Sequence, residues 1–494
     1  MAARVESILK KVIILIYFLV LTVIIGLNIF ESRGYHATEM VMPRFFNILT
    51  LVFSLFLILV VIKFREGLLT FIHSIKKEYI LIPFFIGSAA VQLLVVKWFD
   101  ITPSWDFGTI VHDAAIIFEG QTLNDYFIKY PNNIFLVILL GAVGKLFSPT
   151  LFIFQLFNIC VITLSQYLIY SITKKLASYG TALASLLLSG LFFPYIFFAP
   201  IVYTDTISLL FLLLPLTILI DQNGRFIIKL TRVLPASILF ALGMILKGSL
   251  VIFVIAFAIV LFIFGSKWKK SYSLIPILIL LILKVAFNSW IYQNDFIDKA
   301  KIDRYSFPVT HWLVMGQNSE RFGKYAANDV AWTAELLNKM PKETVSQIHL
   351  KELIARIKEK GVMGNIAYTK EKISHTWTDG TYYSLNKIKR RPIHPENIAS
   401  LLNYKSGHII QAYARIQHLF VMAGILLFSL KVRKEKSETY LFFLLSIIGF
   451  FLFFIMWEAR SRYLVSLTPI FIMMASIGYF GLSKTKSQFN KGIS

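Results

Sequence analysis

Residues 12–30 read VIILIYFLVLTVIIGLNIF, an apolar run that directly follows the basic pair Lys10 and Lys11. A helix needs about 20 apolar residues to cross the hydrocarbon core of a membrane, and this run has that length. The basic start is not followed by the small-residue cleavage pattern of a secretory signal, so we expect a retained signal-anchor helix. The run therefore predicts a chain that is inserted in a membrane.

The composition extends this prediction to all 494 residues. Hydrophobic residues make up 57% of the chain, charged residues only 16%, and 45 residues are Phe. A soluble domain of this size needs more charged surface, because much of any domain faces water. The same figures exclude the disordered, collagen-like and disulfide-rich classes. The single cysteine, Cys160, excludes an intrachain disulfide and a cysteine-based metal site.

Thirteen apolar stretches are candidates for membrane spans. They are residues 12–30, 45–63, 79–96, 133–147, 151–172, 181–198, 205–220, 233–247, 249–265, 273–290, 410–430, 439–457 and 464–482.

The basic residues indicate which of these stretches cross. The chain has 50 Lys and Arg against 27 Asp and Glu, a net charge of +23, and in a membrane protein such an excess marks the cytoplasmic loops rather than a nucleic-acid partner. If every basic loop is inside, both ends of residues 133–147 are outside, so we expect this short segment to lie along the outer interface or to re-enter it. The basic residues used for this assignment are Lys10, Lys11, Lys63, Arg65, Lys76, Lys77, Lys174, Lys175, Arg225, Lys229, Arg232, Lys267, Lys269, Lys270, Lys431, Arg433, Lys434, Lys436, Lys484 and Lys486.

The resulting fold class is an all-α polytopic membrane protein with about twelve transmembrane helices. We divide it into N-terminal transmembrane helices, an extracytoplasmic acidic loop with juxtamembrane helices, a transmembrane core, a small extracytoplasmic domain and C-terminal transmembrane helices. The boundaries are residues 1–97, 98–150, 151–290, 291–408 and 409–494.

Two local features are expected inside the small extracytoplasmic domain. Residues 344–360 form an amphipathic pattern that Gly361 should end, and the pair Asp379-Gly380 is a turn signal.

The first outer loop carries the strongest candidate for chemistry. Residues 105–120 read WDFGTIVHDAAIIFEG, and a helix that begins near Asp106 would place Ile110, Ala114 and Ile117 on one face, a pattern suited to lying on the bilayer surface. Asp106 would then point into a cavity above the membrane. Alternatively, Asp106 is the N-cap of this helix.

Further candidates of the same region are Asp113, in the same acidic loop, and Tyr130, which precedes Pro131.

Asp205 follows the outer turn APIVYT and opens the stretch 205–220. A carboxylate at a helix N-terminus is favourable in itself, which is the structural alternative for Asp205.

Three cations are expected on the outer side, where topology does not require positive charge: Lys247, Arg460 and Arg462. Arg binds phosphate in a bidentate manner and Lys supplies a point charge, so the three together could neutralise a lipid phosphate. The alternatives are snorkelling to lipid headgroups and an ion pair between Arg460 and Glu458.

Two aromatic stretches of the outer domain hold the remaining candidates, His311 in PVTHWLVMG and Asp379 in WTDGTYY. Aromatic rings beside polar groups suit the binding of sugars, although a lone His is more often structural. The chain has no HExxH, P-loop or GxGxxG motif, so zincin, nucleotide-hydrolase and dinucleotide-binding functions have no support.

These features resemble polytopic glycosyltransferases of the GT-C class, which include the lipid A aminoarabinose transferases and the dolichyl-phosphate-mannose protein mannosyltransferases. The resemblance rests on Asp106 ahead of AAIIFEG and YPNN, on Asp205, on LGMILKG at Lys247 and on RSRYLVSLTP from Arg460. THWLVMG and WTDGTYY resemble a Gram-positive bacterial subgroup. Phe107 stands where the family usually has a second acidic residue.

The resemblance implies transfer of a sugar from a polyprenyl-phosphate carrier to a surface glycopolymer such as teichoic acid, with inversion, on the outer face of the bacterial cell membrane. It implies a catalytic role for Asp106 as base and for Asp205. It implies no cofactor, with a divalent metal not expected, and a carrier-charging synthase and a flippase as partners. The residues implied in substrate binding are Asp113, Tyr130, Lys247, His311, Asp379, Arg460 and Arg462.

Two other functions remain open at this point. A lipid-linked saccharide flippase or transporter would need polar residues at mid-membrane depth, whereas the apolar runs are almost free of charge, with Lys284 the main exception. A glycan polymerase or ligase would share the same cavity and differ in substrate size.

Overall fold

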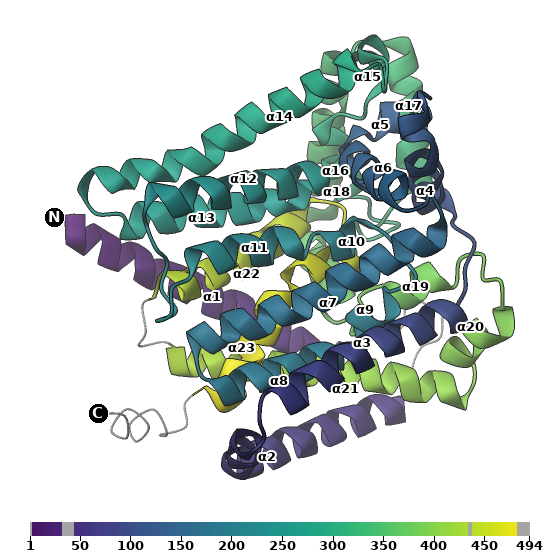
Figure 1. Ribbon diagram of the computed structural model, residues 1–494. Helices are drawn as coiled ribbons and strands as arrows, with labels where there is room; N and C mark the ends of the chain where they lie inside the picture. Colours follow the sequence, from purple (N-terminus) through teal and green to yellow (C-terminus); the bar gives the residue numbers. More distant parts are fainter. Residues whose placement is uncertain (1, 32–43, 433–436, 482–494) are drawn as a thin grey trace.

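Apolar helices that run roughly parallel to one another form the body of the computed structural model, which describes residues 2–31, 44–432 and 437–481 (Figure 1). Over these ranges the chain forms helices and two isolated β-bridges. Eight helical segments are long and apolar enough to cross a membrane. The prediction of an all-α polytopic membrane protein is therefore confirmed. The eight segments are Glu6–Phe30, Phe45–Phe71, Glu78–Trp98, Leu151–Leu176, Lys267–Gln293, Lys405–Lys431, Glu438–Met456 and Ser461–Phe480.

The other apolar stretches form shorter helices: Pro131–Leu146, Tyr179–Gly190, Thr204–Leu219, Leu230–Leu246 and Gly248–Phe264. A continuous helix over residues 181–198 was expected, but the helix ends at Gly190 and a new one begins at Phe193. Pro194 stands in the first turn of the second helix, where its missing N–H is tolerated, and it could not continue the first.

Helices α1 (Ala2–Phe30), α2 (Arg44–Ser74) and α3 (Glu78–Trp98) lie at the edge of the bundle. Only 11% of the most apolar window of α2 and of α3 is buried in the protein, so their apolar side chains face lipid. The apolar stretch 45–63 was expected to end at Lys63, but α2 continues through Lys63 and Arg65, and the chain turns only at residues 75–77. Lys and Arg are good helix formers, which explains the continuation.

The acidic loop forms a small helical layer at the end of the bundle opposite the N-terminus (Figure 1). α6 belongs to this layer, in keeping with the expectation that residues 133–147 do not cross. The elements are α4 (Trp105–Ile116), η1 (Ile117–Glu119), α5 (Tyr126–Lys129), η2 (Pro131–Asn133) and α6 (Ile134–Leu146).

The central part of the chain supplies helices that run along the bundle axis, together with short helical pieces that connect them (Figure 1). They are α7 (Leu151–Leu176), α8 (Tyr179–Gly190), α9 (Phe193–Phe197), α10 (Thr204–Ile207), α11 (Leu210–Leu219), α12 (Leu230–Leu246), η3 (Gly248–Leu250), α13 (Val251–Phe264), η4 (Lys267–Leu274) and α14 (Ile275–Gln293).

The residues expected to form the small extracytoplasmic domain, 291–408, are called the outer segment from here on. This segment follows α14 and lies at the same end of the bundle as α4–α6. Gly361 interrupts α18 with φ +60° and ψ −175°, so the expected end of the amphipathic helix at Gly361 is confirmed, although a second helical half follows it. The elements are α15 (Lys299–Tyr305), α16 (Val309–Met315), α17 (Ala327–Lys339), α18 (Lys342–Trp377), α19 (Ser384–Ile388) and α20 (Pro395–Leu402).

The C-terminal helices α21 (Lys405–Val432), α22 (Glu438–Met456) and α23 (Thr468–Phe480), with η5 (Ser461–Leu467), complete the core. In the most apolar window of Ser461–Phe480, 94% of the residues are buried, which is typical of a helix that is apolar all round and enclosed by others. Gly424 and Gly478 let α21 and α23 approach closely, because a Cβ on Gly478 would collide with the Gly424 carbonyl.

The N-terminus and the basic turn between α13 and α14 lie at one end of the bundle, and the acidic loop and α15–α17 lie at the other (Figure 1). This separation agrees with the expected sidedness, which stays a prediction. Of the residues used for it, Arg433, Lys434, Lys436, Lys484 and Lys486 lie outside the described residues.

Candidate functional site: a charge cluster at one end of the bundle

Asp106 lies in the first turn of α4, within the helical layer that faces away from the N-terminus. The N-cap position is occupied by Ser104, so the N-cap alternative for Asp106 is wrong. Its carboxylate accepts a hydrogen bond from the hydroxyl of Tyr203, at 2.7 Å. Asp106 is therefore held by a residue from a different part of the chain, not by its own helix alone.

The apolar face of α4 was expected on the bilayer surface, and this expectation is wrong. Ile110, Ala114 and Ile117 are all buried within the protein. Gly141 of α6 has no room for a side chain, since a Cβ there would meet Ile117 and Ala114. α6 covers the face and removes it from lipid, and this packing fixes the direction of α4.

Arg462, at the start of η5, lies between the two acidic candidates. Its Nη2 is 4.0 Å from Asp106 Oδ2, and its Nη1 is 3.6 Å from Asp205 Oδ2. Lys247 Nζ donates to Asp205 Oδ1 at 2.8 Å, and Lys387 Nζ lies 3.5 Å from Asp106 Oδ1. We call these five residues the charge cluster; it joins α4, α10, the turn after α12, α19 and η5.

Aromatic rings line the cations of the charge cluster. The ring of Tyr203 lies 4.7 Å from Lys387 Nζ and 5.1 Å from the guanidinium carbon of Arg462. The ring of Tyr463 lies 5.0 Å from Arg462 and 5.7 Å from Lys247 Nζ. Such cation–π contacts stabilise desolvated cations without neutralising their charge.

The two acidic residues differ in access. Asp205 is 1% exposed, and the side chain of Asp106 is 21% exposed. Lys247, which binds Asp205, also donates to the hydroxyl of Ser466 at 3.0 Å. An incoming molecule can therefore reach Asp106, whereas Asp205 is in a position to hold Lys247 and Arg462 in place.

Burial and charge set the protonation of the reachable groups. Burial would raise the pKa of Asp106, but the charges of Lys387 and Arg462 outweigh it and hold this pKa well below its usual range. Burial, followed by repulsion from Arg462, lowers the pKa of Lys387 to about 7, against the opposing attraction of Asp106. At neutral pH, Asp106 is ionised and Lys387 is near its titration point.

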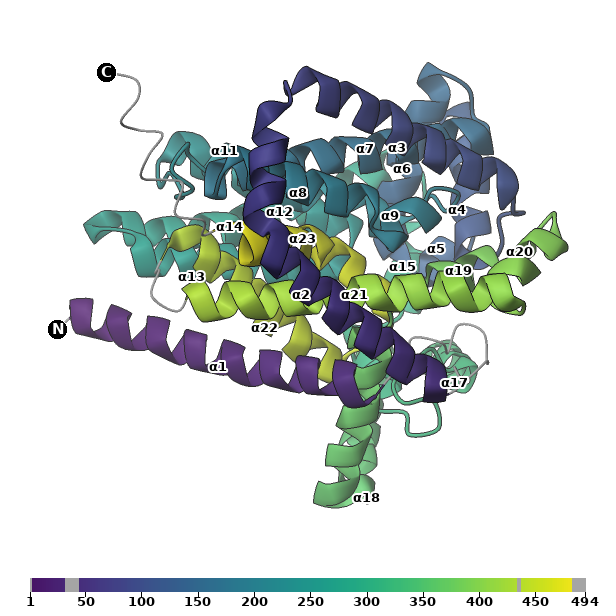
Figure 2. The same cartoon turned by 90° about the horizontal axis from the view of Figure 1, so that it is seen from below.

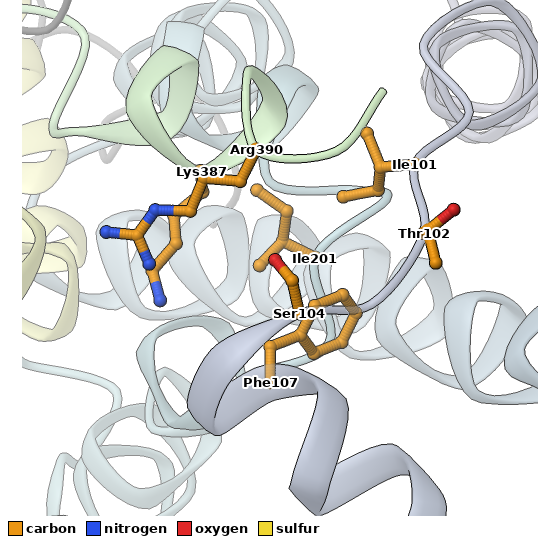
Figure 3. A pocket seen from close by; sticks show the side chains of 7 residues that line it. All are labelled: Ile101, Thr102, Ser104, Phe107, Ile201, Lys387 and Arg390. Carbon is orange, nitrogen blue, oxygen red and sulfur yellow. The ribbon is translucent and has the colours of Figure 1, made fainter. Parts of the chain in front are cut away.

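A small pocket adjoins the charge cluster at Lys387 (Figure 3). Lys387 and Arg390 both line it, and in this view their side chains lie on the same side of the apolar residues. The guanidinium of Arg390 also lies 5.6 Å from the ring of Trp105. The other lining residues are Ile101, Thr102, Ser104, Phe107 and Ile201. The pocket thus combines two cations with an apolar wall, and of the charge cluster only Lys387 lines it.

Arg460 binds a different set of groups from Arg462. Its Nε lies 3.2 Å from Glu458 Oε1, and its Nη1 donates to the hydroxyl of Tyr383. The alternative of an ion pair with Glu458 is therefore present. Arg460 stands two residues before Arg462 in the chain. Its side chain pairs with Glu458, whereas that of Arg462 pairs with Asp106 and Asp205.

Asp379 organises the segment that carries Lys387. Its carboxylate accepts hydrogen bonds from the hydroxyl of Thr381 at 2.6 Å, the amide of Tyr383 at 2.9 Å and the hydroxyl of Ser461 at 2.6 Å. The expected turn at Asp379-Gly380 is confirmed by the bond from the Tyr382 amide to the Asp379 carbonyl. Asp379 connects this turn to η5, between Arg460 and Arg462.

Three further candidates have their hydrogen-bond or ring contacts with residues outside the charge cluster. Asp113 accepts the amide of Asn124 at 2.6 Å, Tyr130 packs its ring against Phe307, and His311 is bonded to Thr333 at 2.7 Å. Their roles in substrate binding stay predictions.

Sequence reasoning missed Lys387, Arg390 and Tyr203. The basic run KIKRR at residues 387–391 lies in the segment expected outside, where topology does not need positive charge. The argument that selected Lys247 would have selected Lys387 and Arg390 as well. Tyr203 had no such signal, because nothing local shows that its hydroxyl meets Asp106.

Over the described ranges, no group of three or more His, Cys, Asp and Glu side chains is placed to hold a metal ion. Metal independence stays a prediction.

Comparisons with known proteins give one family and a distant structural likeness. The family described as "Conserved hypothetical integral membrane protein" matches residues 3–481. No curated protein matches the chain. Among solved structures, the chain is similar to the oligosaccharyltransferase of Archaeoglobus fulgidus, crystallised with a tethered acceptor peptide, at 11% identity and a TM-score of 0.42. The likeness covers 81% of this chain and 49% of that protein, so the chain spans about half its length.

Proposed function

This chain belongs to the family of conserved hypothetical integral membrane proteins, and we propose that it is a glycosyltransferase of the GT-C type. On this proposal it transfers a sugar from a polyprenyl-phosphate carrier to a surface glycopolymer, on the extracytoplasmic face of a bacterial cell membrane. The resemblance of the sequence motifs at Asp106, Asp205, Lys247 and Arg460 to GT-C enzymes supports the enzyme class. The charge cluster supports the transfer chemistry.

The observation that carries the proposal is an accessible carboxylate among more numerous cations. Asp106 is the reachable acid of the cluster, and Lys387 and Arg462 lie within 4.0 Å of it. Arg390 lines the pocket together with Lys387. A site that must bind a phosphate diester needs surplus positive charge, and one that must take a proton from a hydroxyl needs a base.

The apolar side of the pocket supports an amphiphilic donor. Ile101, Phe107 and Ile201 lie across from the two cations. A lipid-linked phosphate carries an apolar chain next to its charge, and cations beside apolar side chains would suit the junction of these two parts. This supports a lipid carrier over a soluble sugar nucleotide as the donor.

The reaction on this proposal is a single displacement. The acceptor hydroxyl attacks the anomeric carbon from the face opposite the phosphate; the new C–O bond forms as the bond to the phosphate oxygen breaks, and configuration inverts. Asp106 takes the hydroxyl proton. The leaving carrier phosphate gains one negative charge, which Arg462, Lys387 and Arg390 stabilise.

Donor binding would also prepare the base. In the free protein Lys387 and Arg462 hold the pKa of Asp106 low, below that of an effective base. A phosphate that draws these cations toward itself would weaken their hold and raise that pKa. Asp205, buried against Lys247, would keep Arg462 from moving away altogether. On this proposal Asp205 is a positioning residue.

The direct test is the surface glycan profile of cells that carry Asp106→Asn. The expected result is loss of one sugar decoration at normal protein level. The matched control is Asp125→Asn, an exposed carboxylate of the same loop, which should leave the profile unchanged. Unaltered decoration in Asp106→Asn would remove this residue from the mechanism.

A second measurement separates transfer from transport. A glycosyltransferase joins sugar to acceptor in detergent solution, where no sealed compartment exists, whereas a flippase has no product there. We expect the purified protein to convert a polyprenyl-phosphate sugar in detergent. Movement of lipid-linked sugar across sealed vesicles without transfer would support the flippase instead.

A further inference from the structure

Helix α18 leaves the bundle sideways. Its two halves meet at Gly361, and Figure 2 shows the helix extending away from the other elements beside the C-terminal end of α1. Around Gly361 there is open space, since a Cβ added there would have no atom within 4 Å. We call residues 361–366 the α18 tip.

The α18 tip exposes apolar side chains. Val362 is 78% exposed, Met363 76% and Ile366 58%. Apolar side chains of a helix normally face a core or lipid, and none of these three has a packing partner in the core.

Two contacts with the end of α1 fix the position of α18 along the bundle axis. The carbonyl of Trp377, the last residue of α18, accepts a hydrogen bond from Asn28 of α1 at 3.0 Å. Lys370 pairs with Glu31, directly after α1, at 2.5 Å. α1 is a candidate membrane span that ends at Phe30. The half of α18 between the tip and Trp377 therefore lies at the same membrane depth as the end of this span.

The neighbouring surface of α1 is itself apolar and exposed. Ile29 is 45% exposed and Phe30 83% exposed, so the end of α1 to which α18 is bonded exposes apolar side chains as the α18 tip does. Lys358, which precedes the tip, is exposed and could meet headgroup phosphates. An apolar tip flanked by a cation at this height matches the boundary between acyl chains and headgroups.

We propose that the α18 tip inserts into the outer leaflet of the membrane that the chain spans, as a lateral anchor of the outer segment. The partner is the headgroup–acyl boundary of that bilayer. This anchoring does not depend on the proposed enzymatic function.

The proposed anchor is also connected, through hydrogen bonds, to the chain segment that leads to the charge cluster. Lys372, in the same half of α18, donates to the carbonyls of Gly316 and Ile455 at 2.5 and 3.0 Å. Ile455 lies in the last turn of α22, just before the segment that carries Arg460 and Arg462. α18 thus connects the lipid boundary with the chain that supplies the cations.

The test uses full-length protein with Cys160→Ser, reconstituted in liposomes of phosphatidylethanolamine and phosphatidylglycerol. A nitroxide label is attached at Met363→Cys, and at Ile366→Cys in a second variant. The measurement is the collision rate with oxygen, which concentrates in lipid, relative to a water-soluble nickel complex. The matched control is Asn338→Cys, an exposed site on α17.

The expected result is an oxygen-to-nickel ratio several-fold higher at residues 363 and 366 than at residue 338. Equal ratios at the tip and the control would overturn the proposal. Spin–spin broadening at 363 that disappears on dilution with unlabelled protein would overturn it too, because a second copy would then cover the tip.

Discussion

Arg462 holds the centre of the charge cluster, because its guanidinium lies within 4.0 Å of Asp106 and of Asp205. Lys247 and Lys387 each approach only one of these carboxylates at the distances observed. A planar guanidinium can serve two carboxylates at once, which an ammonium at the end of a flexible chain does less well.

Replacement of Arg462 by Gln should lower sugar transfer by about 10²–10³-fold, since a donor aimed at the developing phosphate charge is lost. Arg462→Lys should retain part of the activity, because the charge remains while the bridging geometry does not. The measurement is the transfer rate of purified protein. Arg321→Gln, at an exposed arginine, is the control, and equal rates in both variants would contradict the assignment.

Lys387 should make donor binding depend on pH. Because its pKa is about 7, the ammonium is mostly charged at pH 6 and mostly neutral at pH 8. Affinity for an anionic donor should therefore fall as pH rises through this range, by up to about tenfold. Lys387→Arg keeps its charge throughout and should flatten the profile of donor KM against pH, while Lys358→Arg should not.

At the scale of elements, the site depends on connections between segments that have little regular structure. α19 is a short helix and η5 a 3₁₀ segment, so neither is rigid alone. Asp379 connects them through its bond with Ser461. Asp379 itself is buried, where hydrogen bonds to a carboxylate are stronger than in water.

Loss of this connection should cost stability. Ser461→Ala and Asp379→Asn should each destabilise the protein by about 1.5–3 kcal/mol, the contribution of a hydrogen bond to a charged group. The double variant should lose less than the sum of the two, since both changes remove the same bond. Thermal unfolding in detergent measures the three values. Strict additivity would show that the bond contributes nothing.

The contact of α16, α17 and α18 should be sensitive to acid. Burial, with repulsion from His349, lowers the pKa of His311 to about 3. Burial lowers the pKa of His349 to about 4. The unfolded state takes up protons below about pH 6.5 whereas the folded state does not, so between pH 7 and pH 5 each histidine should reduce stability by about 2 kcal/mol.

The protection factors of α16–α18 at pH 7 and pH 5, in which the intrinsic pH dependence of amide exchange is divided out, measure this effect. His349→Gln should reduce the difference between the protection factors at the two pH values, whereas His394→Gln, at an exposed histidine, should not. Protection factors that are the same at both pH values in the unaltered protein would contradict the prediction.

At the scale of the molecule, the short basic turn between α13 and α14 lies at the same end of the bundle as the N-terminus, and the acidic loop and the outer segment lie at the other end. Short loops rich in Lys and Arg stay on the cytoplasmic side, so this arrangement along the bundle axis predicts which end faces the cytoplasm.

Thiol labelling in intact cells should follow this axis. In a Cys160→Ser background, a membrane-impermeant maleimide should label Asn338→Cys on α17 but label Ser266→Cys, before η4, only after the membrane is opened. Both positions are exposed in the structure. Labelling of both in intact cells would place the two ends of the bundle on one side and would remove the basis for an outer site.

The class of the molecule follows from local sequence, for a physical reason. Transfer of an apolar side chain into lipid depends on that side chain alone, so residues 12–30 indicate a span without knowledge of their neighbours. The break at Gly361 and the turn at Asp379-Gly380 are equally local. The choice of candidate site residues was also local, because the expected membrane topology does not explain why these positions are charged. They are Asp106, Asp205, Lys247 and Arg462.

The partners of those charges depend on packing between distant segments. Tyr203 meets Asp106 across 97 residues of chain, and Lys247 meets Asp205 across 42; Lys387 comes from a third segment. Coulomb and hydrogen-bond energies fall off over a few ångströms, so which charges pair is set by how α4, α10, α19 and η5 are held together. No local pattern records those distances, and for that reason Tyr203, and the pairing of Lys387 with Asp106, emerged only once the helices were assembled.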